Sequence, residues 1–272
     1  MRVWRYCSMV LLVVGLLGVV HAGSQLSSGR AQPAQKPNGK TPGIGNQQLD
    51  GIYFGASDTQ YGRTAWLLSL EAGKLRGKLY MPPGVLELKD LKVGETGRIS
   101  FRTETGIGDV LYQFEGESGP KGITGRFDFV RAEPGTDETV FAKTPVLLEK
   151  IKLPVATSQT RDLGGVYSNV GYSTRGEDLT GQQLILFSNG SEWQGIFMWY
   201  EDLEPLALMN VTVTGANLQF RVRGDGGEQN YKGTFSGKKL QLRRTDPNTS
   251  PAFSNIVLFK KGDIRSLFDR RR

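Results

Sequence analysis

The segment Leu49-Asp50-Gly51-Ile52-Tyr53 is the most informative part of this chain, because it returns in similar form as Leu163-Gly164-Gly165-Val166-Tyr167. Three further pairs of similar segments follow in the same order: 99–102 with 218–221, 127–131 with 240–244, and 147–150 with 257–260. The four offsets are 114, 119, 113 and 110 residues, so the order is kept while the loop lengths differ. Solenoid repeats have periods of roughly 20–50 residues. The sequence therefore predicts a duplicated domain.

The N-terminal residues 1–22 have the pattern of a secretory signal peptide. Arg2 and Arg5 precede an apolar run over residues 9–20, and Val20-His21-Ala22 offers small residues for cleavage. An uncleaved anchor is the alternative, but a membrane-spanning helix needs about 20 apolar residues. We expect cleavage, export to the periplasm or the extracellular space, and a mature protein that is not transmembrane.

Cleavage would remove the only Cys (Cys7) and the only His (His21) of the chain. Cys nucleophiles, Cys/His zinc sites and Ser-His-Asp triads need these residue types. Of the 34 Lys and Arg residues, Arg2 and Arg5 would also leave, so 32 basic residues face 27 acidic ones, a formal charge of +5. We expect a non-enzymatic protein with no cofactor, no metal and, because it is exported, no nucleic-acid partner.

The chain divides by composition and by the repeat. The predicted parts are a signal peptide (1–22), a flexible Gly/Pro/Ser/Gln-rich linker (23–48), a first β-barrel domain (49–151), a second β-barrel domain (162–262) and a basic C-terminal tail (263–272). Residues 152–161 form the predicted connection between the two domains. In the tail, Ile264, Leu267 and Phe268 would share one side of a single helical turn. We expect this turn to dock on the protein, with a frayed basic end.

Within both repeats, apolar residues alternate with period two and are separated by Gly-rich turns, which is typical of β-strands. The expected strands are 51–57, 64–72, 74–81, 85–93, 98–104, 109–116, 123–132 and 140–150, then 165–170, 182–189, 192–201, 207–214, 217–223, 230–236, 238–245 and 255–261. Eight strands with short connections predict an all-β fold of two tandem antiparallel up-and-down barrels. A single outer-membrane barrel is the alternative, but its strands would need roughly 9–11 residues.

Both repeats begin with Gly-x-Tyr, at Gly51-Ile52-Tyr53 and Gly165-Val166-Tyr167, and end on a strand that carries Lys150 or Lys260. This layout resembles the calycin superfamily of lipocalins and avidins, in which an opening Gly-x-Trp strand packs under a basic residue of the closing strand. Tyr stands here where that family has Trp. The resemblance implies that a small ligand binds in the barrel mouth.

The densest aromatic stretch is Glu192-Trp193-Gln194-Gly195-Ile196-Phe197-Met198-Trp199-Tyr200. On a strand, its side chains would alternate between two apolar faces. The candidate ligand-binding residues are Trp193, Phe197, Trp199 and Tyr200, for a small hydrophobic or carbohydrate-like ligand. In the alternative hypothesis, one face fills its own barrel and the other packs on the sister domain, which leaves a scaffold protein.

Carboxylates are the one catalytic class still open to a chain without His and Cys. The candidate groups are Glu201-Asp202 with Glu204, Glu177-Asp178, and Asp225 with Glu228. Their spacing in predicted turns is also typical of solvated loops. The alternative function is therefore a carboxylate-dependent hydrolase of envelope or extracellular polysaccharide, which needs two converging carboxyl groups.

Basic residues are spread over both repeats, on strands that would point many of them to solvent. A charge of +5 favours association with anionic surfaces. An anionic envelope surface is therefore a candidate partner beside the small ligand.

Overall fold

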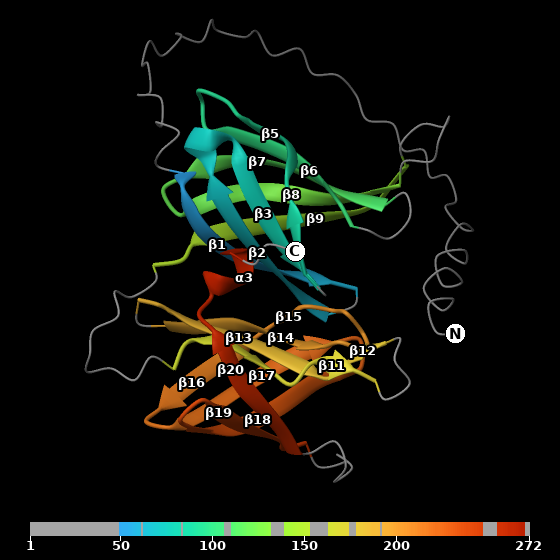
Figure 1. The fold of residues 1–272 in the computed structure, drawn as a ribbon. Coiled ribbons are helices and arrows are strands. Elements are labelled where there is room, and N and C mark those ends of the chain that lie inside the picture. The colour runs from blue at the N-terminus through green and yellow to red at the C-terminus, as the bar shows by residue number, and fades with distance from the viewer. Residues whose placement is uncertain are drawn as a thin grey trace, which may run out of the picture. The chain divides into compact units, whose positions relative to one another are not determined.

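The structure is a computed structural model that describes residues 49–60, 62–82, 84–105, 110–131, 139–152, 163–173, 178–190, 192–246 and 255–269. The fold is all-β and antiparallel, as predicted (Figure 1). Its other described elements are the short turn η2 (Ala72–Lys74) and the helical turn α3 (Ser266–Asp269). Residues 42–272 make one compact unit. The predicted signal peptide and flexible linker lie outside the described residues.

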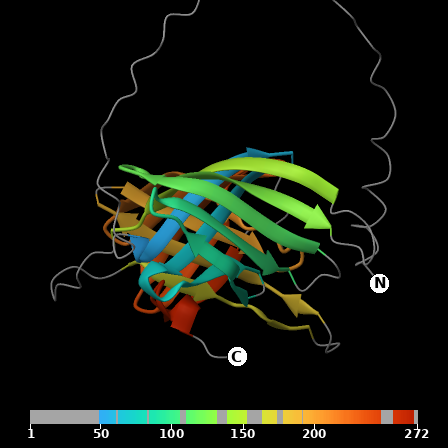
Figure 2. The ribbon, with the colours of Figure 1, turned by 90° about the horizontal axis from the view of Figure 1, so that it is seen from above.

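The first half of this unit contains nine strand segments. They are β1 (Gly51–Thr59), β2 (Gly62–Glu71), β3 (Arg76–Met81), β4 (Gly84–Glu87), β5 (Lys89–Val93), β6 (Arg98–Glu104), β7 (Val110–Gly119), β8 (Gly122–Arg131) and β9 (Thr139–Lys150). Sequential neighbours pair from β1 to β4 and from β5 to β9, and β1 also pairs with β9. From above, β6 to β9 lie side by side as one curved sheet (Figure 2).

The second half repeats this pairing order. Its strands are β10 (Gly165–Ser168), β11 (Gly171–Tyr172), β12 (Leu179–Thr180), β13 (Gln182–Asn189), β14 (Glu192–Trp199), β15 (Leu206–Ala207), β16 (Met209–Thr214), β17 (Asn217–Gly224), β18 (Gly227–Ser236), β19 (Lys239–Arg244) and β20 (Asn255–Gly262). β10 pairs with both β13 and β20. The small β11–β12 hairpin was not predicted. It lies in the connection where the first half has only a tight β1–β2 turn.

The fourth predicted strand of each half is broken in two, in the same way both times. The amide of Leu88 donates to Gly77 O at 2.9 Å, and that of Leu208 donates to Gly195 O at 3.0 Å. Two residues later, Asp90 and Asn210 adopt φ values of +53° and +52°, which Asp and Asn tolerate better than most residues. The register of β5 on β6 and of β16 on β17 shifts at these residues. At both breaks the apolar alternation changes phase, from Leu86 and Leu88 to Leu91 and Val93, and from Leu206 and Leu208 to Val211 and Val213. The prediction of one continuous strand overlooked this change.

The Gly-x-Tyr segments make matching contacts in both halves. Tyr53 and Tyr167 each donate a hydrogen bond of 2.9 Å to the carbonyl oxygen four residues earlier. Each tyrosine is also the cross-strand partner of the closing-strand lysine, and the Lys260 Nζ lies 5.9 Å from the centre of the Tyr167 ring. Gly51 has a φ of +150°, and a Cβ there would meet Lys150 Cε at 2.6 Å. Glycine is therefore required where the lysine crosses the opening strand.

Each half has an interior filled by its own side chains. Trp66, Phe101, Phe114 and Phe127 are among the buried residues of the first. The second contains Tyr167, Phe197, Phe220 and Tyr231. Two stacked pairs correspond, with ring centres 4.9 Å apart for Phe101–Phe114 and 5.1 Å for Phe220–Tyr231.

A third apolar cluster joins the halves, and we call it the shared layer. It consists of Phe54, Ala65, Leu67, Tyr80 and Ile151 from the first half with Val166, Ile185, Phe187, Ile196, Met198, Tyr200, Ala207, Ile264, Leu267 and Phe268 from the second. The strands on either side of it are apolar on both faces. On β2, for example, Leu67 points into the shared layer while Leu68 points into the first interior, and both are fully buried. Burying one such side chain contributes about 1.5–3 kcal/mol.

The backbone also connects the two halves. Leu206 of β15 pairs with Thr64 of β2, and the amide of Ala65 donates to Pro205 O at 2.8 Å. Gly62 lies so close to the second half that a Cβ would stand 2.2 Å from Arg223 O. The sequence did not predict this pairing, because nothing local marks β2 as a strand with neighbours in both halves.

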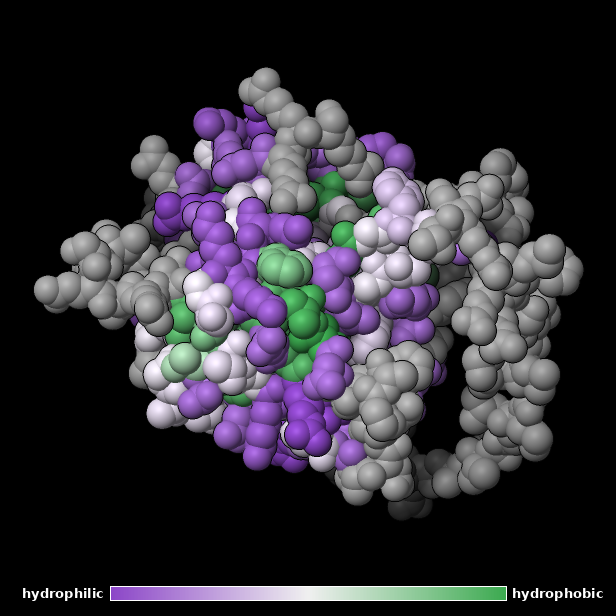
Figure 3. Space-filling model, turned by 60° about the horizontal axis from the view of Figure 1, so that its bottom comes forward, coloured by the Kyte–Doolittle hydropathy of each residue, from purple (hydrophilic) through white to green (hydrophobic). Residues whose placement is uncertain are grey.

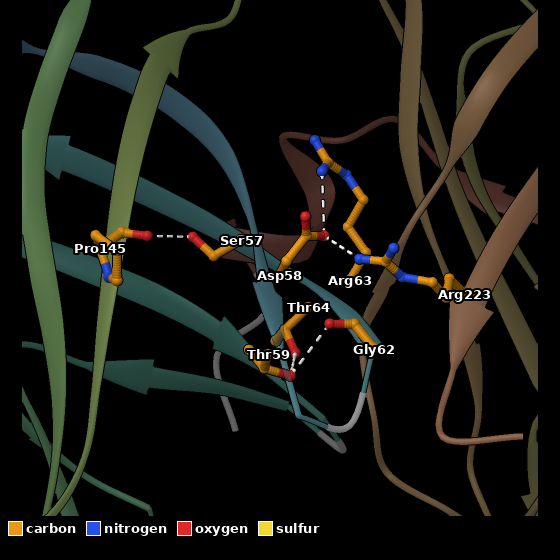
Figure 4. Close-up of polar contacts among 8 residues, drawn as sticks. All are labelled: Ser57, Asp58, Thr59, Gly62, Arg63, Thr64, Pro145 and Arg223. Atoms are coloured by element: carbon orange, nitrogen blue, oxygen red, sulfur yellow. Dashed lines mark hydrogen bonds and ion pairs between the residues drawn. The ribbon is translucent and has the colours of Figure 1, made fainter. Parts of the chain in front are cut away.

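Beside this junction, Asp58 accepts hydrogen bonds from both Arg63 and Arg223 (Figure 4). The three side chains are 38–58% exposed. Ion pairs this exposed contribute about 0–1 kcal/mol. The apolar shared layer therefore holds the halves together. The Arg223–Asp58 ion pair contributes little free energy and mainly orients the two strands that carry it.

The C-terminal turn is docked, as predicted. Ile264, Leu267 and Phe268 are 3%, 8% and 6% exposed within the shared layer. The Lys78 Nζ donates to Phe268 O at 2.6 Å. No described helix has the length and the apolar character of a membrane span.

Candidate functional site

The four aromatic residues singled out by the sequence do not form one pocket. Phe197 is fully buried in the second interior, whereas Tyr200 lies in the shared layer and is 7% exposed. Trp193 and Trp199 are partly buried against the second interior near opposite ends of β14. Six residues of strand separate them, which is about 20 Å. Phe197 and Trp199 are in contact, edge to face with ring centres 5.8 Å apart.

Tyr200 takes part in a buried polar chain instead. Its hydroxyl donates to the Gln183 Oε1 at 3.4 Å, and the Gln183 Nε2 donates to the Tyr80 hydroxyl. Burial raises the pKa of Tyr80 well above its ordinary value, so this phenol stays neutral. Because its partners come from both halves, the chain of hydrogen bonds specifies how the shared layer packs.

The end of β14 that carries Trp199 contains further groups that can contact a ligand. We call Trp199, Gln229, Tyr231 and Arg244 the Trp199 site. The Trp199 indole lies beside the Tyr231 phenol and acts to lower its pKa, and the Tyr231 hydroxyl donates to the Gln229 Oε1 at 2.8 Å. Tyr231 and Arg244 are directly opposite each other on β18 and β19. Burial raises the pKa of Tyr231 to about 12, against the opposing charge of Arg244.

Arg244 is held in place by a carboxylate. Its Nε donates to the Asp246 Oδ2 at 2.6 Å, and the Asn230 side chain and backbone amides donate to the Asp246 Oδ1 at 2.8 and 3.1 Å. Partial burial opposes ionisation of Asp246, but the hydrogen bonds from Arg244 and Asn230 outweigh it and lower the pKa. The site thus offers an aromatic ring, a phenol, an amide and a fixed guanidinium at one end of the second interior.

Sequence comparison of the repeats missed Arg244 because it aligned the wrong residues. The segment 127–131 was matched to 240–244, an offset of 113. The hairpin turns pair Gly119 with Gly122 and Ser236 with Lys239, which gives an offset of 117. Arg244 therefore stands where the first half has Phe127. A four-residue slip keeps the period-two alternation, so the alternation cannot detect it.

Members of two predicted carboxylate groups converge beside the same end of the strands. Glu204 lies between Tyr200 and β15, and the turn between β17 and β18 carries Asp225. Burial, and then the charges of Asp225 and Asp202, raise the pKa of Glu204 to about 7. The Glu204 Oε1 is buried and has no hydrogen-bond partner among the described residues.

The other carboxylates differ. Glu228 forms an ion pair of 3.1 Å with Arg221, and Glu177 lies outside the described residues. In the described part of the chain, no group of three or more Asp, Glu, His or Cys side chains could hold a metal ion. The raised pKa of Glu204 lets its carboxyl carry a proton close to neutral pH.

Comparisons of this chain with protein-family models, with curated proteins and with solved structures find no match.

Proposed function

We propose that this protein is an exported, non-enzymatic binding protein whose second half takes a small apolar or carbohydrate-like ligand at the Trp199 site. The observation that carries the proposal is the placement of Trp199: the ring is partly exposed and packs edge to face on Phe197, beside the Tyr231 phenol. A fixed aromatic face with a few polar groups beside it is typical of small-ligand sites. Export is proposed from residues 1–22 alone.

In this proposal, each half is a small eight-stranded barrel of the calycin type. Support comes from β1, which pairs with β2 and β9, and from β10, which pairs with β13 and β20. The Lys260 amine near the Tyr167 ring supports the resemblance. A barrel of this size has an interior that is filled or holds one small ligand, so a ligand would contact the mouth rather than the filled centre.

Intrinsic fluorescence tests the ligand site, because only Trp66, Trp193 and Trp199 would remain after signal cleavage. The mature protein would be titrated with lipids, neutral oligosaccharides and small metabolites. We expect a saturable shift that Trp199→Phe abolishes. Trp193→Phe is the matched control, because it removes a partly buried ring at the other end of β14 and should leave the shift intact. A shift that survives Trp199→Phe would contradict the proposal.

A carboxylate-dependent hydrolase is the second candidate, favoured specifically by Glu204 with its pKa of about 7 beside Asp225. A carboxyl that keeps its proton close to neutral pH beside a second carboxyl resembles a general acid and its partner. The test is release of reducing ends from acidic and neutral polysaccharides. Turnover that Glu204→Gln and Asp225→Asn both abolish would replace the binding proposal with this one.

A further inference from the structure

An open groove of about 480 Å³ lies on the outer face of β17, β18, β19 and β20. A depression of about 450 Å³ lies at the corresponding place in the first half, on β6, β7 and β8. The two grooves are therefore the same feature of the fold with different side chains. Comparing their side chains shows which features of the groove come from the fold and which are found only in the second half.

The first groove is neutralised by its own charges. Glu115 is directly opposite Arg126, and Glu117 is directly opposite Arg98. Arg126 also forms an ion pair of 2.6 Å with Asp128. Opposite charges on facing positions stabilise a pair of strands. This groove therefore has little attraction left for an ion.

The second groove has the reverse arrangement. Lys232 is directly opposite Arg243, and Gln219 and Asn255 flank them in the same cross-strand row. All four side chains are exposed, and none of the residues lining the groove is Asp or Glu. Like charges on facing positions destabilise a sheet. Within the described residues neither cation has an ion-pair partner, so a bound anion would relieve the repulsion.

The next outward row supplies hydroxyl and amide groups. Thr234 and Gln241 face each other, and Val257 continues the row on β20. Outward rows are about 7 Å apart along the strands, and Phe259, which is 49% exposed, follows in the next row. The view of the molecule from below shows a small hydrophobic patch enclosed by hydrophilic surface (Figure 3). Paired cations, amides and a small apolar area in one groove match a sugar chain that carries acidic groups.

We propose that the outer groove of β17–β20 binds an acidic oligosaccharide, with a carboxylate or sulfate group held between Lys232 and Arg243. The amide and hydroxyl groups of Gln219, Thr234 and Gln241 bond to sugar hydroxyls. This site lies on the outer face of the sheet, whereas Tyr231 of the Trp199 site is buried in the interior. Either site can therefore fail without the other.

The test is direct binding of the full-length mature protein, by calorimetry in about 50 mM salt, to three probes of matched length. The probes are a sulfated or uronate-bearing hexasaccharide, a neutral hexasaccharide and inorganic polyphosphate. We expect saturable binding of the acidic hexasaccharide. Lys232→Gln with Arg243→Gln should weaken it about tenfold or more, because two charge-assisted hydrogen bonds are lost.

The matched control is Lys92→Gln with Lys121→Gln, which removes the same charge from exposed positions of the first half. It should change the affinity by less than about twofold, since exposed charges farther apart than the Debye length, about 14 Å in 50 mM salt, are largely screened. Equal losses in both double variants would overturn the proposal and leave non-specific attraction. Polyphosphate binding as tight as the acidic hexasaccharide would overturn the sugar assignment, and failure of the wild type to bind the acidic hexasaccharide would overturn the site. Trp199→Phe should leave this binding unchanged, which separates it from the proposed function.

Discussion

The interiors of the two halves share a stacked aromatic pair but differ in the residue at the next cross-strand position. Both contain a stacked aromatic pair, Phe101–Phe114 in the first half and Phe220–Tyr231 in the second. At the next cross-strand position the first half has Phe127, which stacks on Trp66 with ring centres 4.1 Å apart. The second half has Arg244 there. The first interior is therefore closed by apolar rings, whereas the second ends in groups that can hydrogen-bond to a ligand.

The difference shows what duplication leaves free to change. The contacts that form the sheet, such as the Tyr–lysine pairs and the broken fourth strands, are present in both halves. The side chains that differ lie at one end of the interior and on the outer face. Function is more readily sought where the halves differ, because packing explains what they share.

The largest expected effect is the loss of stability when a buried leucine of the shared layer or of the first interior is truncated. Leu67→Ala and Leu68→Ala remove adjacent, fully buried side chains on opposite faces of β2. Each should lower the free energy of unfolding by about 2–5 kcal/mol. Only Leu67→Ala should also loosen the halves, seen as faster amide exchange on the shared-layer strands β13 and β14. Identical exchange patterns in the two variants would contradict a distinct shared layer.

The next effect tests whether the opening glycines are equivalent. Gly51→Ala and Gly165→Ala place a Cβ 2.6 and 2.7 Å from Lys150 and Lys260 Cε, at φ values of +150° and +139°. At Gly165 the Cβ would also stand 2.5 Å from the backbone Gly262 O, so the larger loss is expected there. Both should destabilise by about 1–3 kcal/mol in urea unfolding. Gly73→Ala is the control, because a Cβ there meets nothing within 4 Å. A large loss at only one of the two positions would show that the halves use the motif differently.

A smaller effect is expected from the paired tyrosines. Tyr53→Phe and Tyr167→Phe each remove one hydrogen bond of 2.9 Å to a backbone carbonyl. Each should cost about 1 kcal/mol in chemical unfolding. The lost hydrogen bond is to a backbone carbonyl and not to the lysine. A second substitution at Lys150 or Lys260 should therefore not restore stability. A neutral result for both variants would mean that water replaces the phenol.

The last prediction concerns pH and the second half alone. Since the pKa of Glu204 is raised from 4.5 to about 7, the folded state binds the proton more tightly than the unfolded chain. Stability should therefore fall as the pH rises from about 4.5 to 7, and then level off. Glu204→Gln should remove this part of the slope, measured as the melting temperature against pH. An unchanged slope in Glu204→Gln would assign it to other carboxylates.

Local sequence was sufficient for most of the strands and for the apolar side of the C-terminal turn. Residues 65–70 alternate with period two, and both faces of that strand are buried, because β-strand geometry sends successive side chains to opposite sides. Ile264, Leu267 and Phe268 are spaced for one helical face and are buried together. These predictions succeeded because each depends only on neighbours in the chain.

The candidate site was only partly predicted. Trp199 and Phe197 were identified and are in contact, whereas Trp193 lies near the other end of β14 and Tyr200 lies in the shared layer. Tyr231, Gln229 and Arg244 were missed. Their positions depend on the register of β18 and β19, which the hairpin turns set and the alternation leaves undefined.

The sequence by itself determined the all-β class, most of the strand positions and the repeated Gly-x-Tyr opening, since these depend on period-two patterning and on glycine at a positive φ. Only the tertiary structure decided that Leu67 and Met198 belong to one shared layer, that Arg244 stands opposite Tyr231, and that Lys232 faces Arg243. Those facts are contacts between distant segments. They follow from strand register and from which apolar faces pack together. Local patterning is compatible with more than one register and with more than one packing of those faces.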